Sequence, residues 1–114
     1  MQKAIKNELY LLGTKGGPAI RPKGSMPSSS LLVLDNEKIL IDAGLGVAKS
    51  LTEIGFHLSE LSNIFITHLH SDHYLELGPL IHTAWTTGLT EKIKIYGPKG
   101  LIDYWQNFLL SMQY

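Results

Sequence analysis

The segment that most constrains this chain is the run 67–73 (THLHSDH), which places three histidines and one aspartate within six residues. It follows the short apolar run 63–66 (NIFI), whose composition favours a buried strand. Imidazole and carboxylate are common ligands of zinc and related metals at catalytic sites, and the chain has no cysteine to compete with them. The pattern predicts a strand that ends in a metal-binding turn.

The spacing of the ligands predicts two ions. Side chains alternate along an extended backbone, so His68 and His70 point to one side and can hold one metal. Asp72 and His73 come after the chain has begun to turn, so they would face a second ion nearby. The alternative is a histidine-rich surface turn that binds no metal.

The motif His-x-His-x-Asp-His resembles the signature of the metallo-β-lactamase superfamily. The longer run 67–80 (THLHSDHYLELGPL) is similar to its ribonuclease Z and arylsulfatase-like branch. The resemblance implies an α/β fold, the N-terminal half of an αββα sandwich with a mixed sheet and βαβ crossovers. It also implies two Zn²⁺ ions in a complete site, with Mn²⁺ or Fe²⁺ as alternatives.

The same resemblance implies a metal-dependent hydrolase. Phosphodiesters of the RNA type and sulfate esters are the expected substrates, ahead of lactones and β-lactams. His70 favours the zinc hydrolases, because superfamily members that do redox chemistry on two irons resemble His-x-Glu-x-Asp here. Asp72 would hold the second ion and orient the attacking water.

Asp42 ends an apolar run at 39–42 and opens the sequence Asp-Ala-Gly. If this strand and the strand at 63–67 are parallel neighbours, their carboxyl ends meet and Asp42 lies near the metal-binding turn. The superfamily's first motif, Asp-x-Gly, implies a supporting role there. The alternative is an N-cap for the helix at 47–54, and one carboxylate could do both.

The composition fits one globular domain: 114 residues, 44% hydrophobic and 18% charged. Ten basic and ten acidic residues cancel, so no general electrostatic attraction to membranes or nucleic acid is expected. The expected partner is a small-molecule or nucleic-acid ester. The lack of cysteine fits the cytoplasm, and residues 1–8 show no signal-peptide core, although a leader removed earlier would allow the periplasm.

Apolar periodicity divides the rest of the chain into alternating strands and helices. Strands are predicted at 8–12, 31–34, 39–42, 63–67 and 93–96, with a hairpin turn at 35–38. A helix at 47–54 is capped by Gly55, and another starts at Gly78-Pro79 with the apolar stripe Leu80, Ile81, Ala84 and Trp85. A final helix at 101–112 is predicted to pack into the core through Leu101, Trp105, Phe108, Leu109 and Met112.

Several residues outside the motif allow more than one interpretation. The loop 13–18 (GTKGGP) suggests a turn with positive φ rather than a phosphate cradle, and the resemblance adds a place at the rim of the site. Arg21 and Lys23 could meet an anionic substrate or simply be solvated. His82 could reach the substrate, but packing is the preferred interpretation, and His57 is predicted at the surface.

The chain lacks positions for the remaining ligands of the family. A third histidine, a bridging aspartate and a last histidine follow the motif in the superfamily, but only His82 and Asp103 follow it here. Residues 1–114 are therefore predicted to be a partial domain without its C-terminal half. The competing hypothesis is a truncated, non-catalytic metal-binding or self-assembling module, since half a sandwich exposes a sheet face.

Overall fold

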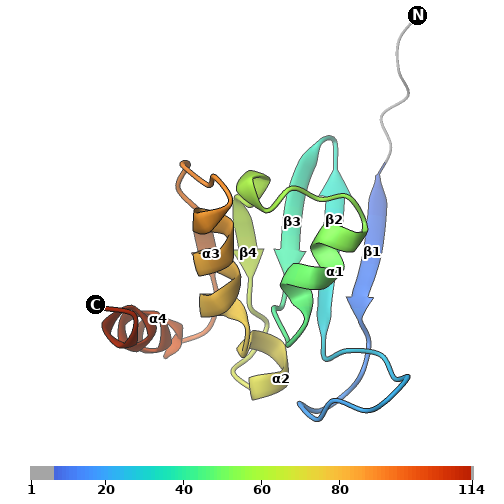
Figure 1. Cartoon of the computed structure of the whole chain (residues 1–114), viewed down its shortest axis with the longest axis horizontal. Helices are drawn as coiled ribbons and strands as arrows, with labels where there is room; N and C mark the ends of the chain where they lie inside the picture. Colours follow the sequence, from blue (N-terminus) through green and yellow to red (C-terminus); the bar gives the residue numbers. More distant parts are fainter. Residues whose placement is uncertain (1–6, 114) are drawn as a thin grey trace, which may run out of the picture.

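One mixed sheet organises the fold (Figure 1). The computed structural model describes residues 7–113. Its five strands lie side by side in chain order: β1 (Glu8–Gly13), β2 (Ser29–Leu34), β3 (Glu37–Ile41), β4 (Asn63–Phe65) and β5 (Lys94–Tyr96). The first two pairings are antiparallel and the last two are parallel. The predicted α/β class with a mixed sheet is confirmed.

Helices make the two crossovers that parallel strands require. The helices are α1 (Val47–Glu53), the 3-10 turn η1 (Leu58–Glu60), α2 (Ser71–Tyr74), α3 (Leu77–Thr86) and α4 (Leu101–Ser111). The first two connect β3 to β4, and the next two connect β4 to β5. The predicted βαβ units are therefore confirmed.

Turn chemistry explains where the elements end. Asp35 and Asn36 form the two-residue loop between β2 and β3, with φ of 47° and 70°. Two positive φ values are what a tight hairpin needs, and Asp and Asn tolerate them well. Gly55 follows α1 with φ of 88°, as predicted for its C-terminal cap. The strand β3 stops at Ile41 because Asp42 turns to φ of 64°.

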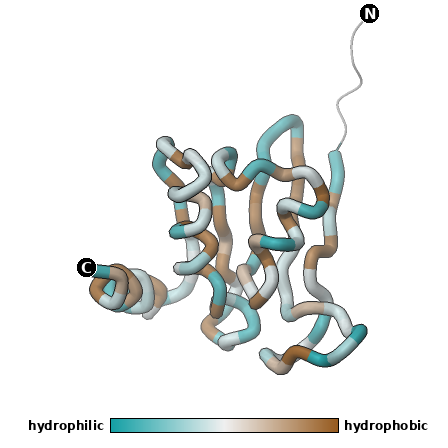
Figure 2. Tube along the Cα trace, viewed as in Figure 1, coloured by the Kyte–Doolittle hydropathy of each residue, from teal (hydrophilic) through white to brown (hydrophobic). Residues whose placement is uncertain are grey.

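The core lies between one face of the sheet and the helices α1 and α3. Leu40 and Ile64 from the central strands are fully buried, as are Val47 and Leu51 from α1 and Leu80 from α3. Figure 2 shows the same arrangement as apolar strands behind helices of mixed polarity.

The other face of the sheet is apolar and largely uncovered within residues 7–113. Leu9 and Leu11 on the edge strand β1 are 59% and 65% exposed. Phe65 and Tyr96 stack on neighbouring strands with ring centroids 4.6 Å apart, and both remain more than 40% exposed.

Two predictions about the helices are wrong. Trp85 was expected in the apolar stripe of α3, but it is 64% exposed. In α4 only Leu101 joins the core as predicted, and the rest of the predicted stripe, Trp105, Phe108, Leu109 and Met112, lies outside it. The reason is its placement: α4 lies beyond α3 in Figure 1 and touches the body along one side, where Tyr104 and Phe108 meet Gly78. A helical period in the sequence shows which face is apolar but not what covers it.

No helix among residues 7–113 is long and apolar enough to cross a bilayer. The prediction about a leader in residues 1–8 concerns a segment that falls almost entirely outside the described residues.

Candidate metal centre

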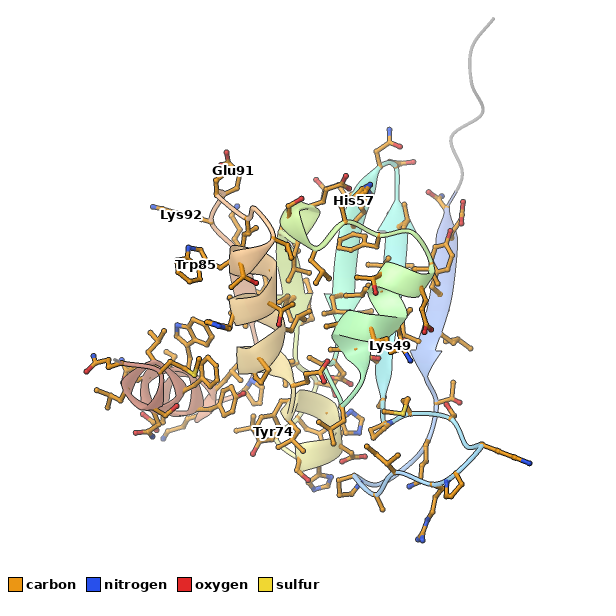
Figure 3. The ribbon with its side chains drawn as sticks, in the orientation of Figure 1. Lys49, His57, Tyr74, Trp85, Glu91 and Lys92 are labelled. Carbon is orange, nitrogen blue, oxygen red and sulfur yellow. The ribbon has the colours of Figure 1, made fainter. Side chains whose placement is uncertain are left out.

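The predicted ligands gather at the carboxyl ends of β3 and β4. Asp42 directly follows β3, while His68 and His70 lie in the extended segment after β4. Asp72 and His73 belong to the short helix α2, whose position Tyr74 marks in Figure 3. The parallel pairing of β3 and β4 brings these segments together, as ends of parallel strands meet at one sheet edge.

Asp42 holds the turn through a buried carboxylate that is 4% exposed. Oδ1 accepts the backbone N–H of Thr67 at 2.8 Å, and Oδ2 lies 2.6 Å from Nδ1 of His73. The hydroxyl of Thr67 is within 2.9–3.0 Å of both oxygens. The N-cap position of α1 is Gly46, and no side chain caps this helix. The alternative role of Asp42 as a helix N-cap is therefore wrong, and its carboxylate bonds to Thr67 and His73 instead.

These contacts set the proton positions on two histidines. An ionised carboxylate only accepts hydrogen bonds, so the neutral form of His73 carries its proton on Nδ1 and its lone pair on Nε2. The Thr67 hydroxyl donates its single proton to Asp42 and therefore accepts one from Nδ1 of His68, 2.9 Å away. Nε2 of His68 then carries no proton, and it faces Nδ1 of His70 at 3.1 Å. One buried carboxylate thus orients two imidazoles, one directly and one through Thr67.

The imidazoles lie close enough to share a bound cation. Nε2 of His68 is 3.1 Å from Nδ1 of His70, and two nitrogens on a tetrahedral zinc ion are about 3.3 Å apart. The rings of His68 and His73 have centroids 4.1 Å apart, so the two predicted ligand pairs adjoin. Nevertheless, no three His, Asp or Glu side chains among residues 7–113 are gathered tightly enough to hold one ion by themselves. The donor types and pairwise distances fit a divalent metal, but the set is incomplete.

Asp72 is kept ionised by its surroundings. Burial alone would raise the pKa of this carboxyl, which is 9% exposed. The N–H groups of Gly17 and of Asp72 itself outweigh that effect, so the pKa of Asp72 lies below its ordinary value. Oδ2 of Asp72 is 3.4 Å from Nε2 of His73. The carboxylate is therefore charged and faces the histidines.

Glu76 is a supporting residue that the sequence analysis missed. Its Oε1 and Oε2 each accept one backbone N–H at 2.9 Å, from Gly46 and Ala48 at the start of α1. Its own N–H donates to the carbonyl of Ala43, whose N–H in turn bonds the carbonyl of His73. Glu76 thus ties the segment after Asp42 to the segment after His73. No local pattern reveals this role, since the partners lie about thirty residues away.

Gly44 is required where three segments of the centre touch. A Cβ at this position would lie 2.5 Å from the carbonyl oxygen of Asp72 and 2.9 Å from both Pro27 and the carbonyl of Ser28. Two of these neighbours are backbone atoms that cannot move easily. The glycine of the Asp-Ala-Gly sequence therefore allows the backbone to pass close to the turn that carries the predicted ligands.

Comparison with known proteins identifies the family. The model of the family Anti-Pycsar protein Apyc1 matches residues 7–113. The chain belongs to this family. The ribonuclease Z of Clostridium botulinum (strain Alaska E43 / Type E3) is 40% identical over 94 residues, which are 82% of this chain and 29% of that protein.

Solved structures agree with this placement. The crystal structure of human tRNase Z, short form, matches with a TM-score of 0.79 at 33% identity, over 93% of this chain and 41% of that one. YhfI of Bacillus subtilis, a metallo-β-lactamase fold protein, matches with a TM-score of 0.71 at 24% identity and the same coverage, which shows the fold alone. The predicted superfamily and its ribonuclease Z branch are confirmed. The chain spans about a third of the length of the curated relatives it matches.

Residues outside the motif divide between the centre and other regions of this Apyc1-family chain. The loop 13–18 reaches the centre, where Gly17 donates its N–H to Asp72 at 2.9 Å. His57 is exposed at the opposite end of the sheet from Tyr74 (Figure 3). His82 is half-buried against Trp85, with ring centroids 5.9 Å apart, in agreement with a packing role. Arg21 and Lys23 are exposed.

Proposed function

We propose that this chain supplies part of the dinuclear metal site of a phosphodiester hydrolase that acts on RNA-type substrates. The observation that carries the proposal is the shared use of Asp42. Its carboxylate holds His73 directly at 2.6 Å and His68 through the hydroxyl of Thr67, so that both Nε2 atoms are free for a cation. The confirmed relationship to the ribonuclease Z branch supports the reaction class.

The residues have distinct roles in this proposal. His68 and His70 would hold one cation, and Asp72 and His73 would hold the other, with zinc as the expected metal. A pair of divalent cations supplies Lewis acidity that polarises the ester and makes water acidic enough to attack at neutral pH. Asp72, held ionised, orients the water, and Asp42 keeps the imidazoles in the ligand-ready tautomer.

The remaining ligands would come from chain that is not in these 114 residues. Two pairs of protein ligands leave each ion short of the three that catalytic zinc sites commonly have. The relatives are about three times as long as this chain, which supports its being one part of a larger domain. The uncovered apolar face that includes Leu11 and Phe65 would then pack against that part, or against a second copy when the chain is alone.

Metal analysis of matched double variants tests the proposal. His68→Ala with His70→Ala should lower the zinc content of the full-length protein and abolish phosphodiester hydrolysis. His57→Ala with His82→Ala also removes two histidines, but outside the centre, and should leave the zinc content and the hydrolysis unchanged. Equal zinc content in the two double variants would refute the metal site. Zinc binding without hydrolysis of any phosphodiester would instead support a non-catalytic module. Light scattering on the 114-residue chain alone tests whether it self-associates.

A further inference from the structure

The loop between the edge strand β1 and β2 forms a strap, defined here as residues 13–28, that reaches the candidate metal centre. At its tip, the backbone N–H of Gly17 donates a hydrogen bond of 2.9 Å to Oδ2 of Asp72. The proposed function uses this contact only through the charge of Asp72 and assigns no role to the strap. Among residues 7–113, the backbone N–H of Asp72 itself is the only other hydrogen-bond donor to this carboxylate.

The strap is fixed along its length rather than loosely draped. The N–H of Thr14 donates to Oγ of Ser25 at 2.8 Å, and the N–H of Lys15 donates to the carbonyl of Met26 at 3.0 Å. Ser28, at its end, accepts the N–H of Gly44 at 3.0 Å. The two arms of the strap therefore bond to each other, and its base bonds to the segment that follows Asp42. The position of the Gly17 N–H is thus set by the fold.

The oxygen that Gly17 holds is the one that faces the histidines. Oδ2 of Asp72 lies 3.4 Å from Nε2 of His73, the nitrogen left free by Asp42. A carboxylate oxygen has two lone pairs, so it can accept the Gly17 N–H and still bind a cation. The hydrogen bond fixes the side-chain torsion of Asp72 and directs the second lone pair toward the centre.

We propose that Gly17 is a positioning residue for the second cation, acting through Asp72. This inference rests on the proposed function, because it assigns the strap to the same metal site. The donor to Asp72 is a backbone N–H and not a side chain. A substitution in the strap therefore removes this hydrogen bond only if it moves the backbone. Mutation of side chains that hold metal ligands in place commonly lowers metal affinity 10- to 100-fold. Loss of a backbone donor to a ligand should lower the affinity by a similar factor.

Two adjacent glycines provide a matched pair of variants. Gly17 has φ of 80°, a region that alanine adopts only with strain, although its Cβ would have room, with Lys15 Nζ at 3.9 Å. Gly16 has no neighbour within 4 Å of a Cβ and no such φ. Gly17→Ala should displace the tip of the strap, whereas Gly16→Ala should leave the tip in place.

Cobalt titration of the full-length protein measures the effect. Co²⁺ alone is the probe, and its visible absorption reports each binding step. Gly17→Ala should weaken the second step about tenfold and shift its band while leaving the first step unchanged. Gly16→Ala should match the unchanged protein within about twofold, as expected for a substitution that meets no neighbour. Equal second-step affinity in all three proteins would overturn the inference.

A metal-free measurement separates this inference from the proposed function. In ¹⁵N-labelled protein without metal, the Gly17 amide should exchange slowly, and Asp72→Asn should shift its resonance more than that of Gly16. An unprotected Gly17 amide would overturn the inference whatever the metal data show. Failure of the unchanged protein to bind Co²⁺, with a protected Gly17 amide, would refute the proposed metal site and the positioning role while leaving the strap contact intact.

Discussion

The two ends of this chain are held in different ways. At the metal centre, a buried carboxylate, backbone bonds and a closely fitted glycine fix almost every atom around Asp42. At the other end, a groove of about 440 Å³ separates α4 from α3 and β5, lined by side chains such as Trp85, Trp105 and Leu109. The comparison teaches that an apolar face alone does not bury a segment. The polar side chains Asp42 and Asp72 are buried, whereas most of the apolar side chains of α4 are not.

Alanine substitution of Gly44 at the centre and of Gly78 beside α4 should give the largest difference in unfolding free energy between the two ends. Gly44→Ala would drive a Cβ into backbone atoms of Asp72 and Ser28, so it should cost about 3 kcal/mol of unfolding free energy. Gly78→Ala meets only the ring of Phe108, at 2.5 Å, which can swing toward the groove. Its cost should be about 1 kcal/mol or less, since alanine also favours the helix. Denaturant unfolding measures both, and equal costs would mean that α4 is as firmly packed as the centre.

Asp42→Asn should lower metal affinity more than it lowers stability. The amide can still accept the N–H of Thr67, but it offers a donor to Nδ1 of His73, which must then carry its proton on Nε2. Zinc affinity should fall 10- to 100-fold, by analogy with other partners of ligand histidines. Competition with a zinc chelator measures the affinity, and ¹⁵N shifts of His73 report the tautomer.

Asp103→Asn is the control for that change, because it removes a carboxylate on the exposed surface of α4. It should leave zinc affinity and the His73 tautomer unchanged. If Asp42→Asn also keeps both, the carboxylate supports the fold alone and the contrast between the two ends has no functional meaning.

A surface ion pair gives the smallest expected effect. Lys38 and Glu60 pair at exposed positions, and the hydrogen bond from Lys38 holds the pKa of Glu60 below its ordinary value. A lowered pKa stabilises the fold above the ordinary value, and this stability is lost as pH falls through the folded value. Glu60→Gln should cost about 0.5 kcal/mol at pH 7, and this cost should shrink as the pH falls below the ordinary pKa of a glutamate. If Glu60→Gln lowers the unfolding free energy as much as Gly44→Ala, an exposed contact matters as much as a buried one. Burial would then not explain the difference between the two ends.

The sequence predicted which residues meet at the ends of β3 and β4, because short local patterns mark them. The histidine spacing and the Asp-Ala-Gly sequence identified the residues that meet at the ends of β3 and β4. Glu76 and the Gly17 contact could not be predicted, because each joins segments far apart in the chain through backbone N–H groups, which every residue other than proline carries. Only the fold determines which of those groups is near a carboxylate.

The strands and crossovers were also predictable, since hydrophobic runs and turn residues mark them directly. The role of α4 was not. Its apolar residues repeat with helical period, yet only Leu101 is buried among residues 101–111. Periodicity defines an apolar face, whereas burial depends on a partner surface that residues 7–113 supply only in part. The same reasoning explains Trp85, whose place on α3 faces the groove rather than the sheet.

The groove has a spectroscopic consequence. The chain has two tryptophans, Trp85 and Trp105, and both line the groove between α3 and α4. Intrinsic tryptophan emission therefore reports on this end of the molecule and hardly at all on the sheet or the histidines. Detachment of α4 would change the emission while far-ultraviolet circular dichroism still recorded an intact sheet. Emission and dichroism followed together during denaturation would thus show whether the two ends unfold as one cooperative unit.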